Sequence, residues 1–216
     1  MNKIVKLLLL SLCISGFTLA QEHEDRASEL LEKVSETLAS YANIKVDFTY
    51  ELVNRSEYIQ QKERGSLVVQ GDSYFLNLMG IKQICDGKQV HTINAENEEV
   101  LIEAVDDAIG EGLNPSSLFS FYKEGYLFSW DIKQPILGGR TIQYIKLTPI
   151  DTYAQAAYLL LGIDTKTHHI YKLIEVGEND TETTLTVRSF TPDVDLAANT
   201  FVFDQKDYPN YYIDRL

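Results

Sequence analysis

Apolar residues recur every three or four positions in the segment that follows residue 20, and the positions between them are charged or small. This interval places apolar side chains along one stripe of a helix. The segment is therefore predicted to form an amphipathic helix that ends near Asn43. The stripe consists of Ala27, Leu30, Leu31, Val34, Leu38 and Tyr41.

A second, shorter helix is predicted within residues 114–126. Asn114 can cap its N-terminus, Pro115 suits the first helical position and Gly125 can end it. The side chains that would line one side of this helix are Leu118, Phe119 and Tyr122.

The rest of the chain has the pattern of short strands joined by turns. In residues 44–52 apolar and polar positions alternate, which is typical of a strand with one buried face and one wet face. Turn residues such as Asp86-Gly87 separate the runs. We predict about ten strands in an antiparallel meander. The runs are 44–52, 65–70, 74–79, 84–93, 98–104, 126–132, 141–150, 156–164, 169–176, 183–190 and 200–203.

The run at residues 74–79, Tyr-Phe-Leu-Asn-Leu-Met, barely alternates. Both faces of this strand are apolar, so the sequence does not decide which face joins the core. The direction of Phe75 is open for that reason, and the pattern raises the question of what covers the second face.

Two short helices cannot cover a sheet of this size as an ordinary second layer. The chain is therefore assigned to the α+β class, mainly β, with a curled antiparallel sheet and helices laid across its concave side. The hollow between them would be lined by apolar side chains. Those side chains either fill it as a core or leave room for an apolar guest, and composition does not separate the two.

Residues 1–20 have the layout of a secretory signal, with two early lysines, an apolar run and a predicted cleavage between Ala20 and Gln21. A membrane anchor is the alternative, but the apolar run is short for a span. Lipid attachment at Cys13 is a further alternative, but it would need a small residue where Leu12 stands. Residues 21–216 are predicted to form one domain.

Composition narrows the class of protein. Of the 216 residues, 44% are hydrophobic, which suits a globular core and not disorder. Cleavage would leave Cys85 as the single cysteine, so the fold needs no disulfide. The net charge is −13, and removal of Lys3 and Lys6 with the signal makes it −15. Such a chain is repelled by nucleic acid and by anionic membranes, so any membrane contact is expected to be transient.

Nothing in the sequence points to catalysis. The histidine and serine motifs of metalloproteases and hydrolases and the phosphate-binding glycine loop do not occur. His168 and His169 are predicted to be solvated turn residues. Adjacent residues point to opposite sides of a strand, so these two cannot easily share a metal. Asp106-Asp107 is predicted to lie in a loop. We expect no enzyme activity, no metal and no cofactor.

The order of elements resembles the bacterial outer-membrane lipoprotein carrier family, the LolA-like proteins. The resemblance runs from LLEKVSETLASYANIKVDFTYEL through the GSLVV hairpin and YFLNL to the DGK turn at 86–88. It continues with NPSSLF, IKLTP at 145–149, LLLGID, HHIYKLIEV and TTLTVRSF, and ends with ANTFVFD. The closing FDQKDYPNYYIDRL is similar to the Bacteroidota-type branch of the family.

This resemblance implies an incomplete, half-closed antiparallel barrel covered by lid helices. It also implies a periplasmic chaperone that carries lipoproteins from the inner to the outer membrane. The implied partners are acylated lipoproteins, an inner-membrane lipoprotein-releasing transporter and an outer-membrane acceptor that the sequence does not identify. We expect a monomer.

An acyl chain needs apolar walls and a movable cover, and the strands and helices supply candidates for both. The predicted lipid-binding residues are Phe48, Tyr50, Leu67, Val69, Phe75, Val90, Ile145, Leu147, Leu159, Leu161 and Ile163. The predicted lid residues are Leu31, Val34, Leu118, Phe119 and Tyr122. Phe75 matches the family's pocket-lining aromatic residue in the strand after the first hairpin turn.

The chain departs from the family at two positions. Many members carry an Arg-Pro pair in the first hairpin turn, where the arginine binds the lid, but this turn reads Gln70-Gly71-Asp72. His91 replaces a tryptophan that is common after the DGK turn. Two other functions fit the same pattern: a periplasmic lipid-sensing regulatory or interaction protein of this fold, and a general fatty-acid or glycolipid binder.

Overall fold

The computed structural model describes residues 24–108, 115, 118–136, 139–177 and 179–216. The predicted signal and its cleavage site lie outside these residues, as does Asn114. Among the residues described, no helix is long and apolar enough to cross a membrane.

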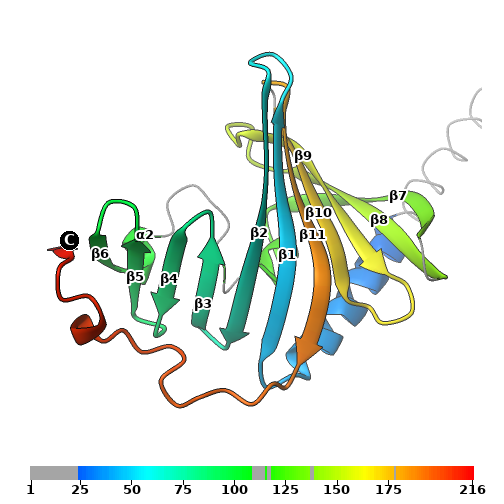
Figure 1. Ribbon diagram of the computed structural model, residues 1–216. Coiled ribbons are helices and arrows are strands. Elements are labelled where there is room, and N and C mark those ends of the chain that lie inside the picture. The colour runs from blue at the N-terminus through cyan, green and yellow to red at the C-terminus, as the bar shows by residue number, and fades with distance from the viewer. Residues whose placement is uncertain (1–23, 109–114, 116–117, 137–138, 178) are drawn as a thin grey trace, which may run out of the picture.

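The described residues contain one twelve-stranded sheet with the order β12-β6-β5-β4-β3-β2-β1-β11-β10-β9-β8-β7 (Figure 1). Its strands are β1 (Ile44–Asn54), β2 (Ile59–Gln70), β3 (Ser73–Leu78), β4 (Ile81–Cys85), β5 (Gln89–Asn94), β6 (Glu99–Ala104), β7 (Tyr126–Ile136), β8 (Arg140–Pro149), β9 (Ala156–Asp164), β10 (Ile170–Gly177), β11 (Thr181–Pro192) and β12 (Tyr212–Arg215). The short helices are α2 (Val105–Ala108), η2 (Phe121–Lys123) and η3 (Gln205–Asp207).

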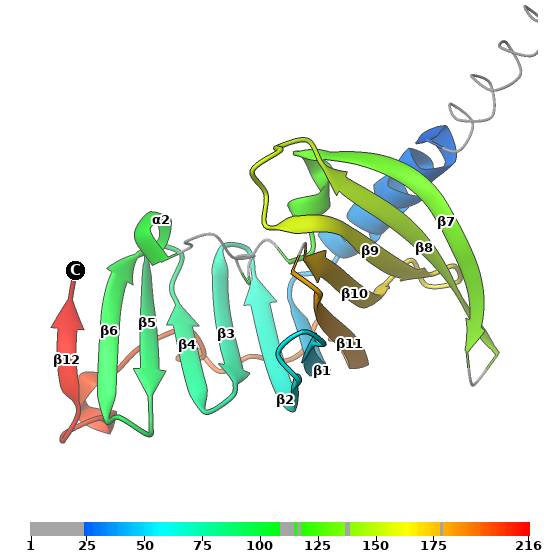
Figure 2. The same ribbon diagram turned by 90° about the horizontal axis from the view of Figure 1, so that it is seen from above.

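The predicted mainly-β class and the antiparallel pairing are confirmed. Strands β1–β6 form one meander and β7–β11 form a second, and the pairing of β1 with β11 joins them. Only the pairing of β12 with β6, among the described strands, is parallel. Figure 2 shows β3–β6 side by side in one row, whereas β7–β9 run obliquely to that row beside the N-terminal helix.

The predicted N-terminal helix is present over residues 24–39. Its apolar stripe packs on one face of the sheet, which we call the inner face, within the larger apolar cluster of the protein. The helix ends earlier than predicted, because Ser40 turns back onto Thr37 and residues 42–43 bind the end of β11. Ala42 N–H donates to Asp193 Oδ1 (2.7 Å), and Val194 N–H donates to Asn43 Oδ1 (2.9 Å).

The predicted second helix is wrong in the part of it that the structure describes. Residues 118–120 form a turn and Phe121–Lys123 a single 3-10 turn, and Gly125 then adopts φ +83°. Leu118, Phe119, Phe121 and Tyr122 all join the inner-face cluster. These four side chains therefore reach the same surface from a turn and a 3-10 turn instead of from the predicted helix.

The predicted strand at residues 200–203 is also wrong, and a strand that was not predicted replaces it. Thr200 N–H and Val202 N–H bond to carbonyls three residues back, at Ala197 and Asn199, so this backbone forms turns. The tail instead contributes β12, which adds to the edge of the sheet beside β6 (Figure 1).

The tail answers the question raised by the two apolar faces of β3. Tyr74 and Leu76 join the inner-face cluster, whereas Phe75 packs in a second cluster on the opposite face, here called the outer face. The second cluster contains Ile84, Ile93, Val100 and Ile102 from β4–β6, with Phe75, Phe203, Tyr208, Tyr211 and Ile213 packed against it. The chain after β11 therefore covers the second face of β3.

Stacked rings hold the tail on this face. The Phe203 ring lies over His91 (centroid distance 4.6 Å) and over Tyr208 (5.4 Å), and Tyr208 contacts Tyr211 edge-on (5.2 Å). His91 is buried and contacts the Ile84 carbonyl through Nδ1 (3.3 Å).

Phe203→Ala is expected to lower the free energy of unfolding by about 2 kcal/mol, because a half-buried ring leaves the His91–Tyr208 stack. Urea denaturation measures this effect. Val202→Ala is the matched control: Val202 is 58% exposed, and its loss should change stability by less than about 0.5 kcal/mol. Equal effects of the two substitutions would contradict the role assigned to the tail.

Candidate functional site

The inner-face cluster brings together all the predicted lipid-binding residues except Phe75. Those buried in it are Phe48, Leu67, Val69, Val90, Ile145, Leu147, Leu159, Leu161 and Ile163, and Tyr50 packs against them. The predicted lid residues Leu31, Val34, Phe119 and Tyr122 are buried in the same cluster, and Leu118 packs against it. The alternation of apolar and polar residues along the strands was therefore sufficient to predict most of the side chains on this surface.

Phe75 does not lie with these residues. It belongs to the outer-face cluster beneath the C-terminal tail. Successive side chains of a strand point to opposite faces, so the burial of Tyr74 and Leu76 on the inner face directs Phe75 away from it.

A small apolar cavity of about 30 Å³ lies between the inner face and the segment 118–121. Its walls are Val46, Phe48, Leu118, Phe119, Phe121, Leu161, Ile170, Leu173, Leu185 and Val187. This volume is close to that of one water molecule, so the described side chains leave little free space at this point.

Several residues of this cavity were not among the predicted ones: Val46, Phe121, Ile170, Leu173, Leu185 and Val187. Leu185 and Val187 alternate with threonines in β11, and this signal could have found them. Ile170 precedes an irregularity in the β10 register, where simple alternation gives no guide.

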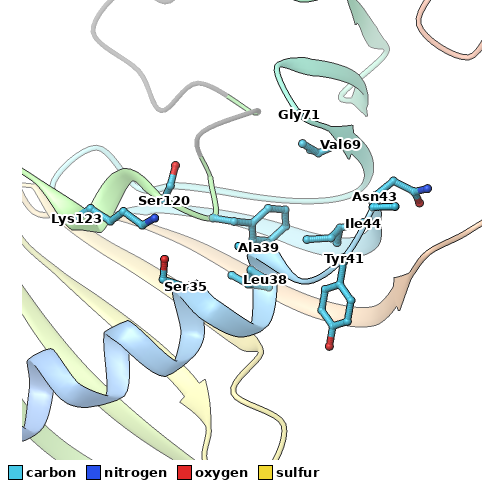
Figure 3. Close-up of a pocket in the computed structure, with 12 residues that line it drawn as sticks. Ser35, Leu38, Ala39, Tyr41, Asn43, Ile44, Val69, Gly71, Ser120 and Lys123 are labelled. Atoms are coloured by element: carbon cyan, nitrogen blue, oxygen red, sulfur yellow. The ribbon is translucent and has the colours of Figure 1, made fainter.

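A larger pocket of about 300 Å³ adjoins the cavity, and Phe119 lines both. It lies between the end of the N-terminal helix, the start of β1 and the segment around Phe119. Figure 3 shows Ser35, Ser120 and Lys123 at one end, with the Lys123 ammonium directed between the two serines, and Tyr41, Asn43 and Ile44 at the other. The described lining therefore combines an apolar wall with one cationic end.

Tyr122 lies beneath this cover and is 1% exposed. Burial raises the pKa of Tyr122 to about 12; the Ser35 hydroxyl lies nearby but outside hydrogen-bond geometry. Within the described part of the protein, no polar atom lies within hydrogen-bonding geometry of the Tyr122 hydroxyl. A buried hydroxyl without a partner costs about 1–3 kcal/mol, so the closed cover holds a polar group that opening would hydrate.

The end of the N-terminal helix is held on the sheet by an aromatic contact. Tyr41 Oη lies 2.9 Å from His169 Nε2, and the His169 ring stacks on Phe190 (centroid distance 3.9 Å). Burial lowers the pKa of His169; Asp164 opposes this shift, and Arg140 and His168 add to it. The sequence analysis placed His169 in a solvated turn, but the structure places it between the helix end and the sheet.

The described residues contain no group of three or more histidine, cysteine, aspartate or glutamate side chains placed to hold a metal ion. Burial raises the pKa of Cys85, which is buried and keeps its thiol close to the backbone of Asp72. The described site offers apolar side chains and one ammonium group, that of Lys123. Groups of these kinds are suited to binding a ligand.

Neither a protein-family model nor a curated protein sequence matches this chain. Among solved structures, it is similar to an uncharacterized conserved protein from Thermus thermophilus, with a TM-score of 0.61 and 12% identity over 88% of this chain and 99% of that one. It is also similar to a DUF1329 family protein from Desulfovibrio piger (TM-score 0.50, 6% identity, 86% and 99% coverage). A LolA superfamily protein from Nitrosomonas europaea matches with a TM-score of 0.45 and 12% identity, over 82% and 98% of the two chains.

The TM-scores of the first two matches indicate a shared fold, and identities of 12% and 6% give no information about activity. The first two matches span nearly the whole length of their partners. The similarity to the LolA superfamily protein is weaker, at a TM-score of 0.45.

Acidification is expected to weaken the attachment of the helix end through His169. Its pKa is lowered in the fold, so the unfolded chain takes up the proton first. The contribution of His169 to stability is full above its ordinary pKa of about 6.5 and declines as the pH falls towards the lowered value. Urea unfolding at pH 7.5 and pH 5 measures the loss. His169→Phe, which keeps a ring against Phe190, should lose less stability over this interval than the wild type; an equal loss would contradict the assignment.

Proposed function

We propose that the protein is a carrier that binds the acyl chains of lipoproteins between the inner face of the sheet and its cover. The cover consists of the helix 24–39 and the segment 118–123. The observation that carries the proposal is the apolar cavity beneath Leu118 and Phe119, which adjoins a larger pocket through Phe119. The collinear resemblance of the sequence to LolA-like carriers supports the same function.

Binding requires the cover to move, because a cavity of about 30 Å³ does not admit an acyl chain. Exposing an apolar side chain of the size of Leu118, Phe119 or Phe121 costs about 1.5–3 kcal/mol, so moving all three costs roughly 5–9 kcal/mol. Burying about a dozen methylenes returns ~10 kcal/mol at ~0.8 kcal/mol each. The two terms nearly balance, which suits a carrier that must also release its cargo.

In this proposal the sheet acts as the wall of an incomplete barrel and the cover acts as its lid. Residues 1–20 serve as a cleaved export signal, and residues 21–216 act as one domain in the periplasm. The partners are acylated lipoproteins, an inner-membrane transporter that releases them and an outer-membrane acceptor. The carrier acts without catalysis, as a monomer with transient membrane contact, in the manner of the Bacteroidota-type branch.

The pocket beside the cavity favours a second candidate, a binder of free fatty acids. Lys123 is the only charged residue among the described side chains that line this pocket, and its ammonium is directed into it (Figure 3). A fatty acid could place its carboxylate there and its chain beneath Phe119. A lipoprotein, whose acyl chains end in esters and an amide, would gain little from this charge.

A photoreactive amino acid at Phe119 is expected to crosslink to a fluorescent triacylated lipopeptide, because this side chain lines both the cavity and the pocket. The same amino acid at Phe75 provides the matched control, since Phe75 is an aromatic residue on the outer face. Gel fluorescence after irradiation measures the labelling. Equal labelling at both positions, or none at Phe119, would contradict binding under the cover.

Lys123→Gln separates the two candidate cargoes. A carrier of lipoproteins should bind the triacylated lipopeptide with the affinity of the wild type, whereas a fatty-acid binder should lose about tenfold in affinity for palmitate through the missing ion pair. Fluorescence competition with both ligands measures the difference. A tenfold loss for palmitate, together with failure of the lipopeptide to bind either protein, would favour the fatty-acid binder.

A further inference from the structure

An open groove of about 830 Å³ lies on the sheet and shares Val187 with the walls of the cavity. Its described walls are Pro135, Ile136, Arg140, Tyr171, Thr186, Val187 and Arg188. Arg140 lies an odd number of residues from Ile145 and Leu147, which point to the inner face, so Arg140 belongs to the outer face. Arg140 therefore faces away from the proposed acyl site, although Val187 borders both, and the inference below does not depend on that site.

Two irregularities of adjacent strands supply two of the groove's side chains. The pairing of β10 with β9 passes from Ile170 to Lys172, and Tyr171 is the extra residue. The pairing of β11 with β1 passes from Val187 to Ser189, and Arg188 is the extra residue. A β-bulge changes the direction of the side chain it carries, and bulges are common beside binding sites.

A buried carboxylate, that of Asp164, holds the Arg140 side chain in place. Its Nε donates to Asp164 Oδ2 at 2.6 Å, and Asp164 is 1% exposed. The other oxygen of Asp164 accepts the backbone N–H groups of Lys166 and Thr167. Burial would raise the pKa of Asp164, but Arg140 and these N–H groups outweigh it and keep the pKa below its ordinary value. The carboxylate therefore stays charged and fixes the guanidinium.

The guanidinium keeps further donors for a ligand. The bond to Asp164 uses Nε, and within the described part of the chain no other hydrogen bond of Arg140 is seen. The Arg140 Cζ lies 5.0 Å from the centroid of the Tyr171 ring, which supports the guanidinium plane from the side. An arginine that is fixed in this way loses little entropy when it binds.

The charge of the groove is opposite to that of the protein. The chain carries a net charge of −13, yet the described lining of the groove includes two arginines and no carboxylate. Arg188 is exposed and has no ion pair among the described residues. Asp164 already balances the charge of Arg140, so the unbalanced charge of the described lining is that of Arg188, which a bound anion would neutralise.

We propose that this groove binds the phosphate group of an amphiphilic phosphate ester. Arg140 and Arg188 supply charged N–H donors and Thr186 supplies a hydroxyl, which together suit the several oxygens of a phosphate better than the two of a carboxylate. Pro135, Ile136 and Tyr171 offer apolar contact for the group that the phosphate carries. The ligand is a phospholipid headgroup with its first carbons, or a soluble organic phosphate.

NMR titration of the mature chain tests this proposal. The ¹⁵N-labelled protein is titrated in separate arms with inorganic phosphate and with dihexanoyl phosphatidylglycerol below its micelle concentration. Saturable shifts are expected at the amides of Tyr171, Thr186 and Arg188. Saturation by both ligands identifies a site for phosphate from any source, and saturation by the lipid alone identifies a headgroup site; both outcomes support the proposal.

Arg188→Gln is expected to weaken binding at least tenfold, and Arg188→Lys should recover part of the loss. Arg215→Gln makes the same change of charge on β12, at the far edge of the sheet, and should leave the affinity unchanged. Arg140→Gln leaves the buried Asp164 without its ion pair and risks unfolding, so Arg188 carries the test. Absence of saturable shifts with either ligand, or equal affinity of Arg188→Gln and wild type, would overturn the proposal.

Discussion

The structure depends on covering a long apolar surface with very little chain. The inner face carries apolar residues from β1–β5 and from β7–β11, and the cover consists of the helix 24–39 and the segment around Phe119. Each covering residue must therefore bury as much surface as it can. The segment 118–122 fits this constraint, because four of its five side chains pack against the sheet.

The same limit applies to the outer face, where the tail provides a different solution. On the outer face, β3–β6 carry apolar residues such as Phe75, Ile84 and Val100, which the N-terminal helix does not cover. The chain after β11 packs Phe203, Tyr208 and Tyr211 against this face and ends as β12 on the sheet edge. Aromatic rings suit this role because few residues cover a large area.

The sequence predicted what depends on local periodicity and missed what depends on distant partners. The N-terminal helix and the strand runs follow from intervals of 3.6 and 2 residues, and so does the shared face of Leu159, Leu161 and Ile163. The strand that pairs with β12 is more than 100 residues away in the sequence. The residues near 212–215 carry no pattern that predicts this pairing. Phe75 could not be placed because both of its neighbours are apolar, and one shift of register reverses the face.

Bulges limit prediction in the same way. Alternation assigns Tyr171 and Arg188 to faces by counting, but an extra residue in each strand invalidates the count. The bulge depends on how two strands meet, so it cannot be found from either strand alone. The arginine groove could not have been found without the structure.

The described contacts at the two ends of the N-terminal helix differ in kind. At its C-terminal end, Ala42 and Asn43 bond to Asp193 and Val194, and Tyr41 contacts His169, so this end is tied to the sheet by several polar contacts.

Near the other end, Arg26 lies over the Trp130 ring at 4.6 Å, a contact worth about 0.5–1 kcal/mol when exposed. The described polar contacts of the helix are therefore concentrated at its C-terminal end, whereas Ala27, Leu30, Leu31 and Val34 hold the rest of it by burial in the inner-face cluster. In the proposed carrier, lifting this part of the helix would expose these apolar side chains, so their burial, more than the Arg26 contact, keeps the cover closed.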